Sequence, residues 1–192
     1  MKSQIRKSLK FSLVIAVITF VLAAIFSIVS SSVLSEVVWI AGLVIVFIIL
    51  LIGVVFDMLG IASTAAQEAP FHAMAAEKVK GAKESVIIIR NADKFASFCN
   101  DVIGDISGIV SGTASGIVVL QISRELGQGD GSAVYLALSV LLTALVAALT
   151  VGGKALGKFL AINASTKIIF FAGKVIAFIE GNFKVRLLPR NN

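Results

Sequence analysis

The chain contains little of what soluble and secreted proteins depend on. Of its 192 residues, one is a cysteine, two are prolines and only 15% are charged. A single cysteine excludes an intrachain disulfide scaffold, and the scarcity of proline excludes collagen-like chains. The hydrophobic share is 58% and the mean hydropathy +1.01. A soluble domain of this composition would expose larger apolar patches than monomeric proteins do. The sequence therefore predicts an integral membrane protein.

Long uncharged runs indicate the number of membrane crossings, because a transmembrane helix needs about 20 predominantly apolar residues. Runs 11–34, 37–56 and 133–153 contain no charge, and run 102–122 contains only Asp105. The first run is longer than the apolar region of a signal peptide, so we expect it to be retained. The prediction is an all-α, polytopic membrane protein with four transmembrane helices.

The basic residues alternate with these runs. Of 17 Lys and Arg, four precede the first run, five lie between the second and third, seven follow the fourth, and only Arg124 lies between the third and fourth. Cytoplasmic loops are the ones enriched in Lys and Arg. We therefore expect one membrane domain in the plasma membrane (the inner membrane of a bacterium), with cytoplasmic termini, connector (57–101) and tail (154–192). Because topology accounts for the net charge of +6, we expect no nucleic-acid partner.

The connector contains several helix signals. The weakly polar segment 58–66 is either a re-entrant turn or a continuation of the second helix. Pro70 suits a first helical turn, which predicts a helix over 71–89 on the membrane surface, with Gly81 as its weak point. Asn91 is then expected to cap the next helix.

The tail is predicted to form a juxtamembrane amphipathic helix over 168–179, since this apolar stretch is too short to span and contains Lys174. Three basic residues beyond it are expected to be attracted to anionic lipid: Lys184, Arg186 and Arg190.

Small residues recur every fourth position in the third run, at Gly104, Gly108, Gly112 and Gly116. Such a stripe lets helix backbones approach closely in lipid. A second small stripe, formed by Ala144, Ala148 and Gly152 in the fourth run, is its expected mate.

Ionisable residues enter the same region. Ser97, Asp101 and Asp105 share one face of the third helix, and Lys154 and Lys158 follow the fourth run at the same cytoplasmic depth. Charges within a span mark functional sites by default. The acids and hydroxyls predict a hard-oxygen site for Mg²⁺; Asp–Lys ion pairs and interfacial anchors are the alternative interpretations. The single histidine, His72, and the lack of any nucleophilic or phosphate-loop motif predict that the protein is not an enzyme.

Residues 56–175 resemble the transmembrane domain of the CorB/CorC/cyclin-M magnesium-transporter family. Segment 91–97 (Asn-Ala-Asp-Lys-Phe-Ala-Ser) is similar to that family's Asn-Pro-Asp-Arg-Leu-Leu-Ser, and segment 153–161 is similar to its closing Gly-Glu-x-x-Pro-Lys-x-x-Ala. The resemblance implies a homodimer with a Mg²⁺ site built from serines, an asparagine and the glutamate. The positions that it suggests as metal ligands are Ser63, Ser97, Asp101 and Asp105.

This chain departs from the family pattern at that site. Lys154 stands in place of the glutamate, Gly157 in place of the proline, and Asp105 in place of an asparagine. Two hypotheses follow. The protein is a divalent-cation (Mg²⁺-type) transporter-like protein, or it is a non-transporting membrane scaffold or regulator in which an Asp–Lys pair replaces the ion.

Overall fold

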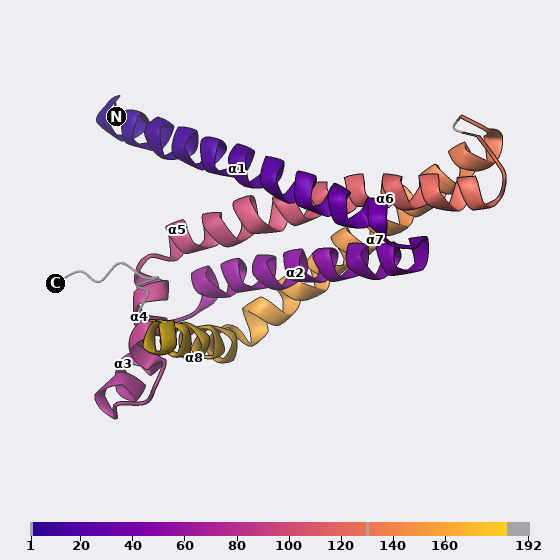
Figure 1. Ribbon diagram of the computed structural model, residues 1–192. Helices are drawn as coiled ribbons and strands as arrows, with labels where there is room; N and C mark the ends of the chain where they lie inside the picture. Colours follow the sequence, from indigo (N-terminus) through magenta and orange to yellow (C-terminus); the bar gives the residue numbers. More distant parts are fainter. Residues whose placement is uncertain (1, 130, 184–192) are drawn as a thin grey trace. The chain divides into compact units, whose positions relative to one another are not determined.

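The computed structural model describes residues 2–129 and 131–183, and these are helical with short turns and no strand. Along the chain come the helices of Figure 1: α1 (Lys2–Glu36), α2 (Trp39–Ala65), α3 (Ala69–Ala76), α4 (Ala82–Arg90), α5 (Ala92–Ser97), the π-helical segment η1 (Phe98–Gly104), α6 (Asp105–Glu125), α7 (Ala133–Asn163) and α8 (Ser165–Phe183). The all-α prediction is confirmed.

Four segments among the described residues are long and apolar enough to cross a membrane. They are Leu9–Glu36, Trp39–Ala65, Ala92–Glu125 and Ala133–Asn163. Each contains or largely overlaps one predicted run, and the later three extend well beyond it. Of the two interpretations of 58–66, the structure shows the helix continuation, because α2 runs without a break to Ala65.

The chain divides into two compact units. The first comprises residues 1–54 and 102–153, and the second comprises residues 55–101 and 154–192. In the first unit, Val46 of α2, Val118 of α6 and Val146 of α7 pack in one buried cluster. A second cluster joins Val102, Ile106 and Val110 to side chains of α1. Large apolar side chains such as Phe20, 75% exposed, cover the outside, as lipid-facing surfaces require.

Helix α6 buries its serines rather than its glycines. Ser107, Ser111 and Ser115 are buried, and their hydroxyls donate to carbonyls one turn back at 2.7, 3.0 and 2.6 Å. A Cβ added at Gly108, Gly112, Gly116 or Gly152 would meet nothing within 4 Å in the described chain. Gly104, the first position of the stripe, belongs to η1 and is buried. The expected packing of the other three glycines on the small stripe of α7 is not seen within the described chain.

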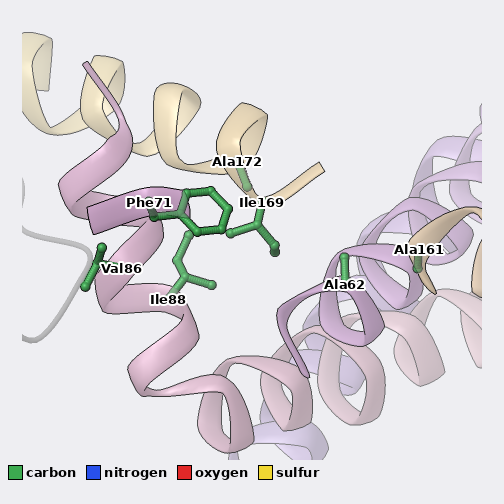
Figure 2. Packing of buried hydrophobic residues seen from close by; sticks show 7 residues of the cluster. All are labelled: Ala62, Phe71, Val86, Ile88, Ala161, Ile169 and Ala172. Atoms are coloured by element: carbon green, nitrogen blue, oxygen red, sulfur yellow. The ribbon is translucent and has the colours of Figure 1, made fainter. Parts of the chain in front are cut away.

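In the second unit, α4 packs against α3 and α8. The buried Phe71 ring lies close to Ile88 and Ile169 (Figure 2). The Ser85 hydroxyl bridges two elements, donating to the Gly81 carbonyl at 2.8 Å and to the Ile169 carbonyl of α8 at 3.1 Å. The tail helix is confirmed as α8, which contains the predicted range 168–179; Lys184, Arg186 and Arg190 lie outside the described residues.

Two connector predictions are wrong. Segment 71–89 is not one helix but two, since the chain turns between α3 and α4 with positive φ at Lys78 (59°) and Gly81 (90°). The turn needs glycine because a Cβ at Gly81 would lie 2.6 Å from the backbone nitrogen of Lys174. Asn91 makes no side-chain cap to α5; its amide donates instead to the Ile87 carbonyl at 2.9 Å and closes α4.

Candidate functional site

A buried ion pair lies at the start of the second unit. Asp57, in α2, is only 7% exposed, and its Oδ1 lies 3.8 Å from the ammonium nitrogen of Lys154 in α7. Lys154 has a further interaction besides this one. A carboxylate in an apolar helix is costly unless it is paired or coordinates an ion. The pair therefore marks a candidate functional site.

Asn100 meets α2 one turn beyond Asp57. A Cβ at Gly60 would overlap the Asn100 carboxamide, whose Cγ would lie only 2.6 Å away. Asn100 belongs to η1, and π-helical turns inside α-helices are frequent at functional sites. The glycine thus lets the side chain of Asn100 reach the backbone of α2.

Within the part of the chain that the structure describes, two buried oxygens in this region accept no hydrogen bond. They are Oδ2 of Asp57 and Oδ1 of Asn100. Buried polar atoms are nearly always satisfied, and an unsatisfied one calls for an explanation such as an ion. Ser63, 1% exposed, is the next polar residue along α2, and its hydroxyl donates to the Gly60 carbonyl at 2.7 Å. Its oxygen retains acceptor capacity.

The residues expected at the site differ in burial and do not all belong to the same unit. Ser63 is buried, Ser97 is half-buried, and Asp101 and Lys158 are exposed, all within the second unit. Asp105 is exposed at the start of α6 and belongs to the first unit. Of the residues expected at the site, only Ser63 shares helix α2 with Asp57 and Gly60.

Asp57, Gly60 and Asn100 were missed by sequence reasoning. In the sequence Asp57 directly follows the second apolar run and is the only charged residue between positions 37 and 67. An isolated charge in such a stretch is the signal that could have identified it. No local pattern distinguishes Asn100, since its role depends on contact with α2.

A second polar cluster lies outside the spans. Oε1 of Glu68 accepts hydrogen bonds from Arg90 Nε (2.5 Å) and pairs with His72 Nε2 (2.7 Å). Two hydrogen bonds hold the pKa of the Glu68 carboxyl below its usual range. The one with His72 has the larger effect and the one with Arg90 the second largest. This cluster ties the residues before α3 to the end of α4.

The oxygen atoms of Asp57, Ser63 and Asn100 are chemically suited to a hard cation. Carboxylate, carboxamide and hydroxyl oxygens are ligands that Mg²⁺ and Ca²⁺ accept. The described residues contain no group of three or more His, Cys, Asp or Glu side chains able to hold a metal. Any cation here would therefore depend on one carboxylate, neutral oxygens and water.

Comparison with known proteins returns no match: no family model, no curated protein and no solved structure is similar to this chain.

Proposed function

We propose that the protein is a divalent-cation (Mg²⁺-type) transporter-like membrane protein, without enzymatic activity, whose ion site includes Asp57, Ser63 and Asn100. The observation that carries this proposal is the pair of buried oxygens, Oδ2 of Asp57 and Oδ1 of Asn100, that lack hydrogen-bond partners among residues 2–129 and 131–183. Such oxygens cost stability unless a cation or water satisfies them. Ser97, half-buried at the end of α5 and three residues before Asn100, is a further candidate oxygen donor.

Lys154 competes with the ion in this proposal. Its ammonium lies 3.8 Å from Asp57, where it provides the positive charge that a bound cation would otherwise supply. An ion that binds Asp57 must displace the ammonium or share the carboxylate with it. Removal of Lys154 is therefore expected to strengthen cation binding rather than abolish it.

The same ion pair favours a second candidate, a non-transporting membrane scaffold or regulator. A Lys–Asp pair that is never displaced neutralises the site permanently and leaves no room for transport. The two candidate functions differ in whether a cation can displace the Lys154 ammonium from Asp57.

Flux into proteoliposomes that contain a magnesium-sensitive dye separates the candidates. We expect flux in the wild type, loss of flux in Asp57→Asn and Asn100→Leu, and equal or faster flux in Lys154→Ala. Lys158→Ala, one turn along α7 and exposed, is the matched control and should behave as wild type. Absence of flux in both the wild type and Lys154→Ala, with the fold intact by circular dichroism, would establish the second candidate instead.

We also propose a homodimer formed through the open glycine face of α6. In lipid, small residues at a helix surface permit close backbone approach, and Gly108, Gly112 and Gly116 have nothing against them in the described chain. The proposed location is the plasma membrane of the cell (a bacterial inner membrane), with both termini cytoplasmic, which rests on the distribution of Lys and Arg.

A further inference from the structure

A basic pocket lies in the second unit, and its lining includes none of Asp57, Ser63 and Asn100. It has a volume of about 850 Å³, is open to one side, and is lined by the turn between α3 and α4 and by the end of α8. Among the described residues, the lining contains one acid, Glu84, and four lysines: Lys78, Lys80, Lys83 and Lys174. Such a concentration of one charge is unfavourable unless an anion compensates it.

The turn is held against α8 by close backbone contact. Gly81 touches the backbone of Lys174, and a Cβ at Gly173 would overlap the Ser85 hydroxyl and the Gly81 carbonyl. Lys78 adopts a φ of 59°, a conformation that costs free energy for a residue other than glycine and that clusters at ligand sites. The pocket is therefore a built feature of the packing between α4 and α8.

The lining is amphipathic. Val79, Ala177 and Phe178 add apolar surface beside the lysines, and the Lys174 ammonium lies 4.4 Å from the centre of the Phe170 ring, a contact that restrains it. The volume falls within the about 300–1,000 Å³ typical of pockets for small organic ligands, so it exceeds what a single inorganic anion fills.

The elements that line the pocket follow candidate membrane spans along the chain. Helix α8 begins at Ser165, directly after the candidate span that ends at Asn163, and the turn follows α2 by a short helix. Juxtamembrane lysines attract anionic headgroups at about 1 kcal/mol each. We propose that this pocket binds the phosphate headgroup of an anionic lipid, with Lys83 of α4 and Lys174 of α8 as its principal cationic contacts. This inference does not depend on the proposed ion site.

Native mass spectrometry of the full chain in neutral detergent tests the proposal. Phosphatidylglycerol, phosphatidylcholine and inorganic phosphate are titrated separately, and we expect retention of phosphatidylglycerol alone. The double variant Lys83→Gln/Lys174→Gln should bind phosphatidylglycerol about 30-fold more weakly, which corresponds to two lysines at about 1 kcal/mol each.

The matched control is Lys94→Gln/Lys167→Gln, which removes two exposed lysines from α5 and α8 outside the pocket. Its affinity should equal that of the wild type. An equal loss in both double variants would overturn the proposal, because binding would then depend on overall charge. Displacement of phosphatidylglycerol by inorganic phosphate at similar concentration would overturn the assignment to a lipid.

A steric variant tests the pocket without changing its charge. Gly181 lines the pocket, and a Cβ there meets nothing within 4 Å, so Gly181→Trp should fill the space and reduce lipid retention. Gly129→Trp, in the loop before α7 and equally open, should retain the lipid as wild type does. Unchanged retention in Gly181→Trp would contradict the proposal, and the comparison among ligands in the wild type remains decisive if a variant does not fold.

Discussion

At the residue scale, the meaning of Asp57 depends on the length of its helix. A charge that follows a long apolar run ordinarily marks the membrane boundary. Helix α2 instead continues to Ala65, which turns that boundary position into a buried one. Sequence reasoning identified Ser63 only through a resemblance and missed Asp57, because hydropathy reports where a run ends and not where a helix ends.

Gly60→Ala should destabilise the fold. The added Cβ would overlap the Asn100 carboxamide, and overpacking of this kind costs about 1–3 kcal/mol. The free energy of unfolding in mixed micelles measures the effect. Gly152→Ala, where a Cβ meets nothing within 4 Å, should not destabilise the fold, because alanine is the better helix former. Equal effects in the two variants would contradict the close contact with Asn100.

Glu68→Gln should lower the melting temperature at neutral pH and have no effect in acid. The pKa of Glu68 is lowered in the folded protein from its usual value of 4.5, so its contribution is present above that value and is lost as the pH falls through the lowered pKa. Melting temperatures of wild type and variant, measured from neutral pH to below the lowered pKa of Glu68, should therefore become equal at low pH. Glu77→Gln, which changes an exposed acid beyond α3, is the control. A difference that persists at low pH would contradict the assignment to the carboxylate.

At the element scale, the spacing of small residues in α6 does not determine which face of the helix is buried. The sequence predicts a helix rich in small residues, but serine and glycine occupy adjacent positions, about 100° apart on the helix. Both faces are small, so spacing alone cannot decide which is buried. The serine face can satisfy its own hydroxyls by bonding carbonyls one turn back, and this removes the main cost of burying it.

Substitutions on the two faces of α6 should therefore have opposite consequences. Ser111 is fully buried, so Ser111→Leu should overpack the first unit and destabilise it by about 1–3 kcal/mol. Gly112→Leu enters open space and should leave the fold of one chain intact while preventing the proposed dimer. Thermal stability and crosslinking in membranes measure the two effects separately. A Gly112→Leu variant that still crosslinks as a dimer would contradict dimerisation through the glycine face.

At the scale of the whole molecule, hydropathy predicted more of the structure than local patterns did. The number of candidate spans agrees with the uncharged runs, because a bilayer requires continuous apolar helices. The division into two units could not be predicted, since its boundaries fall inside α2, η1 and α7. Those helices run through both units, so no linker or change of composition marks the transition.

The orientation in the membrane can be tested with single cysteines. Cys99 is the only cysteine and is 2% exposed, so the wild type should resist a membrane-impermeant maleimide and serves as the background control. Glu77→Cys lies in the connector and Gln128→Cys in the loop before α7, and both positions are exposed. We expect intact cells to label Gln128→Cys alone and inverted vesicles to label Glu77→Cys alone, because the connector contains five basic residues and the loop only Arg124. The reverse labelling would invert the orientation, and labelling of both from one side would show that the third span does not cross the membrane.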